Sequence, residues 1–416
     1  MAKTLFQNLN VNGSTITADR FYLIQGRLVT GLSTETNGQI TMNQAGTFST
    51  LTVTCSANTT TVCDVYIRKN LANTACTVNY TSNQTGTKQD LTHSFTIVAG
   101  DEVNYMADIT SGASIGFRLM STIFDSTTDS YSLFAGNGNT TIGQNDGLTN
   151  YYTITGLLPA GLTTETDTQS TMMCGGTFKH MYVFVTTNTK TENADFYVSI
   201  NASTTGCPTI QYTSGQTGVK EDTSTTKASI DGDSVCFKCI TAANAGTTTI
   251  TFSLISCGYY TTEGKQTWAS SSPTQTQAIS TTRWAPVFAN VQTQTTESLC
   301  QSYWEGQDCL VTELEAECPV NGNTANPSLT LDLRLETANA GLQLTWTASQ
   351  TGTKSIIGNI RLKNHALMDI QYTTGGSGAN VTINQSNILM MSDPFPVLSV
   401  KTKYPYWEID ENDNIG

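Results

Sequence analysis

One segment of this chain occurs three times, with about 130 residues between successive copies. YTSNQTGTKQD at residues 80–90 returns as YTSGQTGVKED at 212–222 and, in weaker form, as WTASQTGTKSI at 346–356. This period is too long for a solenoid repeat, which spans about 20–50 residues, and it matches one small domain. The sequence therefore predicts three tandem copies of one module, whose function should come from arraying that module.

Each copy has the pattern of β-strands. In GTFSTLTVTCS, residues 46–56, Leu51, Val53 and Cys55 alternate with threonines, which is the period of a half-buried strand. The counterpart GTFKHMYVFVT at 176–186 alternates in the same way. No window has an apolar stripe at helical spacing, and turn signals recur between the short strands. We therefore predict an all-β fold of three tandem antiparallel β-sandwich domains, each similar to an eight-stranded jelly roll.

Polar, glycine-rich stretches separate the predicted modules. These stretches suit extension, so we expect a rod of modules that assembles with other chains, and the alternative is a chain that closes on itself as a pseudo-trimer. The predicted boundaries are an N-terminal arm at 1–18, modules at 19–125, 149–260 and 283–398 (the last divergent), linkers at 126–148 and 261–282, and a C-terminal arm at 399–416.

The order of motifs resembles a known family. G-T-F-x-x-L-x-V is followed by Y-I-R-K-N at 66–70, then by Q-T-G-x-K-x-D and A-G-D-x-V. This order resembles the small β-sandwich modules, often likened to tumour-necrosis-factor or complement-head jelly rolls, of phage fibres and virion surface proteins. It covers most of copies one and two, whereas copy three keeps QTGTK and reads KNHALMDI at 363–370 where the A-G-D turn is expected. The resemblance implies an architecture and a viral setting, and it brings no active-site residue.

The composition suits a particle coat. Charged residues make up 13% of the chain, against about a quarter in an ordinary protein, and hydroxyl and amide side chains take their place. Such a surface resists nonspecific ionic adhesion and tolerates changes of salt. The net charge of −13 and the lack of a basic cluster beyond pairs such as Arg68–Lys69 argue against nucleic-acid binding.

The sequence predicts neither membrane insertion nor export through a signal peptide. No stretch reaches eighteen consecutive apolar residues, which a membrane-spanning helix needs. The opening MAKTLFQNLNVNGST lacks the basic, apolar and small-residue pattern of a signal peptide. We therefore expect synthesis in the host cytoplasm and a final location on the virion surface.

The cysteines number eleven, and they do not recur at equivalent positions of the copies. A disulfide framework would be expected to repeat with the module. We therefore predict that most are buried thiols that act as small apolar residues.

No catalytic motif is evident in the sequence. The three histidines, His93, His180 and His365, fall at different positions of their modules, which favours neither a catalytic triad nor a three-histidine metal site. We therefore predict no enzymatic activity, no catalytic residue and no cofactor.

One glutamate recurs in all three copies: Glu35, Glu165 and Glu297, within T-E-T, T-E-T and T-E-S. A glycosidase needs two carboxylates in one cleft, which one glutamate per module does not supply. Each either accepts backbone hydrogen bonds at a turn or makes an inter-module contact three times over. We treat these glutamates as candidate inter-module or partner contacts.

Three further glutamates lie two residues apart in LVTELEAEC at 310–318. Glu313, Glu315 and Glu317 would share one face of a strand. They could gather a calcium ion together with oxygens from a neighbour, which makes them a candidate metal site. The alternative is a solvated face that protects an edge strand from aggregation.

Aromatic residues in polar segments suggest contact surfaces. Trp268 lies in a Ser/Thr/Gln-rich stretch and is a candidate for stacking on a glycan ring, while Tyr404, Tyr406 and Trp407 precede an acidic tail. The C-terminal group could stack on sugars or dock on a neighbouring subunit, and we expect docking.

These observations predict a non-enzymatic virion structural protein, a surface decoration or fibre component of a bacteriophage. Its expected partners are copies of itself, possible trimers included, and other virion proteins. The alternatives are a receptor-binding tail adhesin that contacts host glycan and a glycan depolymerase.

Overall fold

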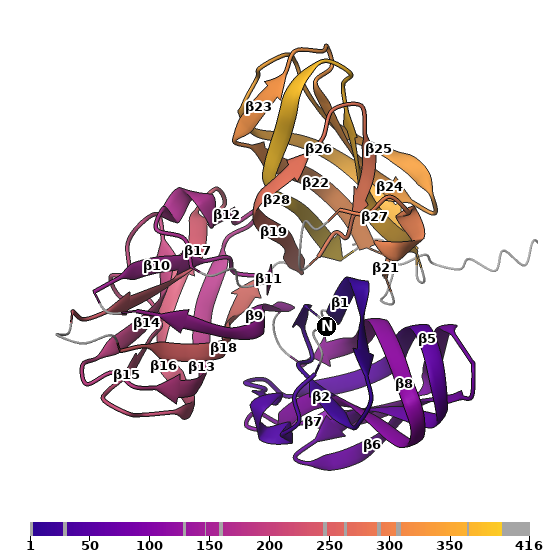
Figure 1. Ribbon diagram of the computed structural model, residues 1–416, viewed down its shortest axis with the longest axis vertical. Helices are drawn as coiled ribbons and strands as arrows, with labels where there is room; N and C mark the ends of the chain where they lie inside the picture. The colour runs from indigo at the N-terminus through magenta and orange to yellow at the C-terminus, as the bar shows by residue number, and fades with distance from the viewer. Residues whose placement is uncertain are drawn as a thin grey trace, which may run out of the picture.

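The chain folds into three bodies of β-structure (Figure 1). The computed structural model describes residues 3–27, 31–127, 130–145, 147–157, 161–243, 248–261, 264–288, 293–304, 309–363 and 366–392. These residues form 28 strands and three 3-10 helices of three residues each. Nearly all strand pairs are antiparallel, and β1–β3 and β9–β11 are short parallel pairs. The predicted all-β, antiparallel fold is confirmed.

The first repeat is built on one eight-stranded sheet of order β3-β1-β8-β5-β6, with β2 and β4 paired to β8 and β7 paired to β5. Two long strands, β5 and β8, run through it and bend around a common core. The repeat comprises β1 (Lys3–Ile16), β2 (Arg20–Tyr22), β3 (Gly26–Arg27), η1 (Glu35–Asn37), β4 (Ile40–Thr41), β5 (Gly46–Lys69), β6 (Ala72–Thr81), β7 (Gly86–Ile97) and β8 (Glu102–Ser126).

The second repeat divides the same architecture into two five-stranded sheets. One has the order β11-β9-β18-β13-β16, and the other has β10-β17-β14-β15 with β12 paired to β17. Its elements are β9 (Ser130–Gln144), β10 (Thr149–Tyr152), β11 (Gly156–Leu157), η2 (Glu165–Asp167), β12 (Ser170–Thr171), β13 (Gly176–Asn188), β14 (Ala194–Ile200), β15 (Thr209–Tyr212), β16 (Gly218–Ser229), β17 (Ser234–Thr241) and β18 (Ile250–Thr261).

The third repeat is also a pair of five-stranded sheets. These are β19-β28-β22-β26 with β23 paired to β28, and β20-β27-β24-β25 with β21 paired to β27. Its elements are β19 (Lys265–Gln277), β20 (Thr282–Ala285), η3 (Glu297–Leu299), β21 (Ser302–Tyr303), β22 (Cys309–Cys318), β23 (Val320–Asn323), β24 (Leu329–Leu335), β25 (Ala338–Trp346), β26 (Gly352–Leu362), β27 (Leu367–Thr374) and β28 (Gly378–Ser392).

The segments predicted as an N-terminal arm and two linkers are instead the first strands of the repeats. β1, β9 and β19 pair antiparallel with the last strands β8, β18 and β28. Each inserts one aromatic residue, Phe6, Phe134 or Trp268, into the interior, where it is at most 3% exposed. The prediction failed because these strands are rich in Ser, Thr, Asn and Gln, which obscures the alternation of apolar and polar residues.

The recurring Q-T-G motif is a turn that satisfies its own polar groups. The hydroxyl of Tyr80 donates to the carbonyl of Gly86 at 2.9 Å, and Gln84 Oε1 accepts from the Thr81 amide at 2.9 Å and from Lys88 Nζ at 2.6 Å. Gly86 has a φ of 89°, a conformation that side chains disfavour. The same contacts recur in the second copy and, with Trp346 in place of the tyrosine, in the third. The motif is therefore structural.

The aspartate that ends the motif in copies one and two fixes the neighbouring strand. Asp90 accepts the backbone N–H groups of Thr77 and Thr92, each at 3.1 Å, and lies 2.9 Å from His93 Nδ1. Burial opposes ionisation, but these hydrogen bonds outweigh it and lower the pKa of Asp90 to about 2. Asp222 accepts the equivalent backbone N–H groups of Thr209 and Ser224, and its pKa is also lowered to about 2, whereas the third copy has Ile356 at this position. Its contact with Asp90 therefore gives His93 a structural role.

The third repeat lacks the A-G-D motif and holds the corresponding strands together by a different contact. In the first repeat, Asp101 accepts the Val98 amide and the Asn70 side-chain amide at 2.8 and 2.7 Å. In the third repeat, Glu336 accepts the amide of Leu367 at 2.9 Å and ties the corresponding strands together. The third copy thus keeps the fold by a different hydrogen bond.

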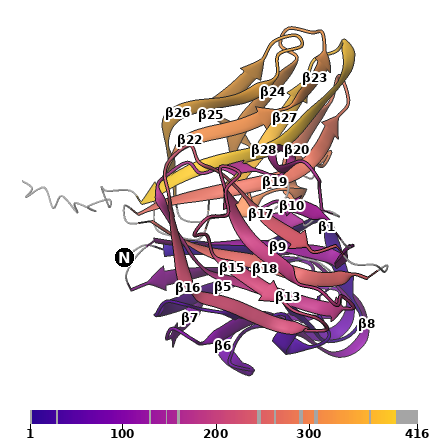
Figure 2. The same cartoon turned by 90° about the vertical axis from the view of Figure 1, so that its left-hand side faces the viewer.

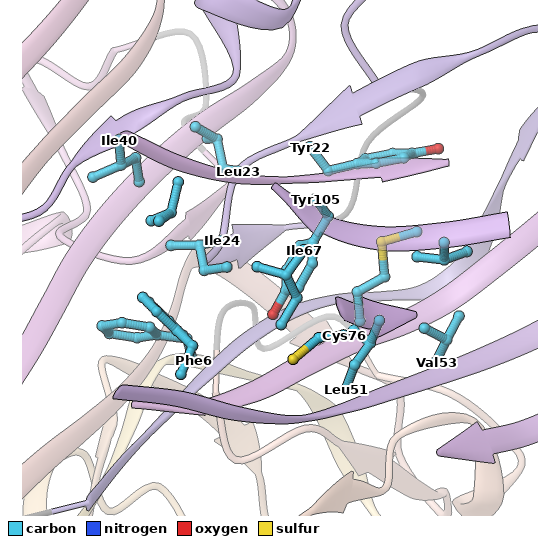
Figure 3. Packing of buried hydrophobic residues seen from close by; sticks show 14 of the residues in the cluster. Phe6, Tyr22, Leu23, Ile24, Ile40, Leu51, Val53, Ile67, Cys76 and Tyr105 are labelled. Atoms are coloured by element: carbon cyan, nitrogen blue, oxygen red, sulfur yellow. The ribbon is translucent and has the colours of Figure 1, made fainter. Parts of the chain in front are cut away.

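Apolar residues from both layers of each repeat meet in its interior. In the first repeat, Phe6, Leu51, Val53, Ile67 and Tyr105 lie within the core (Figure 3). In the third repeat, the core includes alternate residues of β24. All eleven cysteines are buried and none is in a disulfide, as predicted. Within the described part of the chain, no helix is long and apolar enough to cross a bilayer.

Candidate functional site: the interfaces between the repeats

The three repeats close on one another, so that each contacts both others (Figures 1 and 2). Between repeats one and two, the Tyr131 ring stands edge-on to Phe6 at 5.8 Å. Between two and three, the hydroxyl of Thr155 donates to the Ala269 carbonyl at 3.0 Å. Between three and one, Gln266 Nε2 donates to the Lys3 carbonyl at 2.5 Å. This arrangement is the pseudo-trimer, and the expected extended rod is wrong for the isolated chain.

One position of the repeat makes a contact with a neighbour in all three cases. It is the second residue of the short strand after each 3-10 helix: Thr41 in β4, Thr171 in β12 and Tyr303 in β21. Thr41 Oγ1 donates to Glu221 of repeat two at 2.6 Å. The Thr171 carbonyl accepts from Asn387 of repeat three at 3.4 Å, and the Tyr303 hydroxyl lies 3.3 Å from Thr87 Oγ1 of repeat one. The contacts run head to tail and close a ring.

Each neighbour is received on the outward face of one sheet. The strands that carry these faces are β5, β13 and β22. They align because Cys55, Val185 and Cys318 pair with the motif glycines that begin β7, β16 and β26. Their outward positions are Thr50, Thr52 and Thr54; His180, Tyr182 and Phe184; and Glu313, Glu315 and Glu317. We name each interface by two numbers, first the repeat whose sheet face is covered and then the neighbouring repeat that covers it: 1–3, 2–1 and 3–2.

The 2–1 interface is aromatic. Tyr182 and Phe184 are 4% and 6% exposed and belong to the core cluster of the first repeat. Burial raises the pKa of Tyr182 above its usual range. His180 Nε2 lies 3.2 Å from Glu221, the residue that accepts from Thr41, and Lys179 Nζ lies 3.7 Å from the ring centroid of Tyr260. This interface therefore combines apolar burial with a polar rim.

The 3–2 interface is acidic. Glu315 is buried against the second repeat and accepts from Asn387 Nδ2 at 3.4 Å. Burial raises the pKa of Glu313, Glu315 and Glu317, and the nearby carboxylates of Asp231 and Asp167 add to the effect. Ionised carboxylates therefore repel one another across this interface.

The proposed roles of these three glutamates need correction. β22 lies between β28 and β26, so they do not protect an edge strand. The calcium candidate also fails, because no three His, Cys, Asp or Glu side chains among the described residues are grouped so that they could hold a metal ion. Their strand spacing placed them on one face as predicted, but the neighbouring repeat brings more carboxylates and covers that face.

The 1–3 interface contains a cavity of about 210 Å³. Its first-repeat wall includes Thr54 and Arg118, and its third-repeat wall includes Ser298, Gln301 and Tyr303. Beside it, Leu9 and Leu119 pack on Cys300, Trp284 and Tyr303. This interface therefore has a polar hollow beside an apolar contact.

The recurring glutamates bind within their own repeats and not across the interfaces. Glu35 accepts from Arg68 Nε and Nη2 at 2.5 and 2.9 Å, and Glu297 accepts from Arg334 Nε at 2.9 Å. Glu165 accepts from the Ser199 hydroxyl at 2.5 Å. Each begins a 3-10 helix, and its carboxylate fixes that helix to a strand of the same repeat. The inter-module role expected of these residues is wrong; the contact lies six residues further on.

Next to these glutamates, each repeat buries a different polar residue at one position: Asn104, Cys236 or Asp369. Asp369 is 1% exposed, and its Oδ1 has no hydrogen-bond partner. Burial, together with the charge of Glu297, raises the pKa of Asp369 to about 8, while Arg334 opposes the shift. The third repeat therefore contains a carboxyl group that prefers to be protonated near neutral pH.

The remaining candidates fall in two groups. Trp268 is 3% exposed and packs edge-on against Phe288 with ring centroids 5.9 Å apart, so it cannot stack on a glycan. Tyr404, Tyr406, Trp407 and His365 lie outside the described residues. No sequence signal marks Thr41 or Arg118, since neither lies in a distinctive motif.

Comparison with known proteins gives only distant likenesses. No family model and no curated protein sequence matches the chain. A solved structure from Sulfolobus turreted icosahedral virus is 13% identical, covering 94% of this chain and 97% of that one, with a TM-score of 0.20. A triple jelly-roll protein of an archaeal virus turret is 14% identical over 91% and 90%, with a TM-score of 0.19. The VP2 subviral particle of infectious bursal disease virus is 10% identical over 94% and 81%, with a TM-score of 0.20. TM-scores this low carry no argument about the present chain.

Proposed function

We propose that this chain is a non-enzymatic structural protein on the surface of a virus particle, where it acts as a preassembled pseudo-trimer. One observation carries the proposal: Thr41, Thr171 and Tyr303, at the same position of three repeats, each contact the next repeat and close a ring. Joining three subunits in one chain raises their effective concentration to about millimolar, so the ring forms without an encounter between chains. Ring formation within one chain suits a protein that places a three-part unit on a larger assembly.

The exterior supports the same function. Only 13% of the residues are charged, so the surface is solubilised mainly by Thr, Ser, Asn and Gln. Such a surface changes little with salt or ionic surroundings, which suits a protein that remains outside a cell. The resemblance of the repeat motifs to phage-fibre modules makes a bacteriophage, and a decoration or fibre role, the expected setting.

Assembly requires further contacts between this unit and other molecules. The expected partners are further copies of the chain and other virion proteins, with the C-terminal residues Tyr404, Tyr406 and Trp407 as the proposed docking segment. The tail-adhesin alternative loses its main support because Trp268 is buried in the third repeat.

Immunogold electron microscopy would test the proposal. An antibody against the purified chain should label the surface of particles released from the producing host, and the head or tail position of the label would separate decoration from fibre. If the antibody detects the chain in the lysate but leaves particles unlabelled, the proposal is wrong. A release of reducing ends from host capsule by the purified chain would contradict a non-enzymatic role.

A further inference from the structure

The 1–3 interface contains a partly buried guanidinium group that no described carboxylate pairs with. Arg118 lies on β8, and its Nε is buried and makes no hydrogen bond. Two other arginines of the described chain, Arg68 and Arg334, form ion pairs with Glu35 and Glu297. Burying an arginine Nε without an acceptor is unfavourable, and an anion bound beside it would relieve that penalty.

A β-bulge aims this side chain. On β8, Leu119 pairs with Thr54 and Phe117 pairs with Cys55, so Arg118 is the extra residue between two consecutive partners. β-Bulges redirect side chains and are frequent beside binding sites. The second repeat has Ser253 in the corresponding bulge, between Phe252 and Leu254. The second repeat therefore lacks the cation, which is no requirement of the fold.

The cavity beside Arg118 has room for a small molecule. Its volume of about 210 Å³ compares with the roughly 10–15 Å³ that one water molecule requires. Hydroxyl groups of Thr54, Thr87, Ser298 and Tyr303 line it. Thr87 Oγ1 lies 2.9 Å from Thr54 Oγ1 and 3.3 Å from the Tyr303 hydroxyl, so these three hydroxyls form one connected array. Three leucine side chains complete the lining: Leu9, Leu119 and Leu299.

We infer that this cavity binds a small carboxylate that also bears hydroxyl groups, such as one uronic-acid unit of an acidic polysaccharide. The planar guanidinium fork of Arg118 matches a carboxylate, and the array of hydroxyls matches the hydroxyl groups of a sugar ring. The leucines contact the apolar faces of that ring. Because both walls contribute, binding also ties the third repeat to the first.

The inference is tested by measuring the binding of glucuronate to the full chain with ligand-observed NMR. Glucose is the matched neutral sugar and inorganic phosphate the matched anion. Glucuronate should bind at least about tenfold more tightly than either, because its carboxylate adds a charge-assisted pair that glucose lacks and its ring adds contacts that phosphate lacks. Equal binding of glucose, tighter binding of phosphate, or no binding of glucuronate at about 100 mM would overturn the inference.

Substitutions locate the site. Arg118→Gln should weaken glucuronate binding by about tenfold or more, and Arg118→Lys should recover part of it, since a lysine keeps the charge without the fork. Arg20→Gln, which removes a guanidinium from β2, should change nothing. Tyr303→Phe, on the opposite wall, should weaken binding less than Arg118→Gln. The melting temperature of each variant verifies folding, and unchanged binding by folded Arg118→Gln would refute the site.

Discussion

The 2–1 and 3–2 interfaces use the same face of the same strand but opposite chemistry. On β13, this face presents Tyr182 and Phe184 to the core of the first repeat. On β22, the equivalent face presents Glu315 and Glu317 to a repeat that contributes further carboxylates. The backbone geometry is shared, whereas one interface gains apolar burial and the other buries charge.

This contrast separates two determinants of assembly. Strand pairing and the bulges fix which positions of a repeat meet its neighbour, while the side chains at those positions set the strength and pH response of each interface. The three interfaces therefore share one backbone geometry and differ in the chemistry of their side chains.

Unfolding of the third repeat should have the largest effect on this comparison, because it removes the 3–2 interface altogether. Leu333 is fully buried in β24 at the centre of its sheet. Leu333→Asp buries an unpaired carboxylate at a cost of several kcal/mol, roughly the stability of a domain. Hydrogen exchange should show the third repeat unfolded and the 1–3 and 3–2 faces exposed, while β13 stays protected. Thr330→Asp, at a half-buried position of β24, is the control. Wild-type protection throughout would mean that β24 is wrongly placed.

Truncation at the two equivalent positions compares the interfaces directly. Tyr182→Ala removes a buried ring and should destabilise the chain by about 3–5 kcal/mol. Glu315→Ala removes a buried carboxylate whose pKa is raised and should leave stability unchanged or increased near neutral pH. Denaturant unfolding monitored by fluorescence measures both. An equal loss in the two variants would show that the interfaces do not differ in kind.

The buried carboxyl of Asp369 should make the third repeat more stable in acid. Its pKa rises from about 3.9 unfolded to about 8 folded, so the folded state binds more protons between these values and stability falls as pH rises through that window. Asp369→Asn, which copies Asn104 of the first repeat, should remove this dependence and stabilise the protein by a few kcal/mol, in order of magnitude, at pH 8. The reciprocal Asn104→Asp should transfer the dependence to the first repeat. Thermal unfolding across pH measures both, and parallel profiles for wild type and Asp369→Asn would contradict the assignment.

The hydrogen bond of Thr41 gives the smallest effect. Thr41→Val removes the donor to Glu221 at the rim of the 2–1 interface and should cost about 0.5–1 kcal/mol. A double-mutant cycle with Glu221→Gln isolates the pair, and a coupling near zero would show that the aromatic residues alone stabilise this interface. Thr54→Val, in the unrelated 1–3 interface, is the comparison for loss of a threonine hydroxyl.

Local pattern was enough to predict the elements with strong signals. Period-two alternation located β5 and β13, and the uneven cysteines were correctly predicted to be buried thiols. The structure adds that the Q-T-G motif is a turn whose residues hydrogen-bond to one another within eleven positions. Local pattern does not reveal the polar first strands or the burial of Trp268, because the pairing partners of these strands are the last strands of each repeat.

The sequence by itself determined the repeat, the strand class and the turns, because these depend on interactions between residues close along the chain. Only the tertiary structure decided where the repeats touch. Thr41, Thr171 and Tyr303 share a position but no residue type, and their partners lie 180, 216 and 216 residues away. Contacts at such separation depend on how whole sheets are oriented, which no local pattern of side chains encodes. The ring, the acidic 3–2 interface and the cavity beside Arg118 therefore emerge only when the three repeats are packed together.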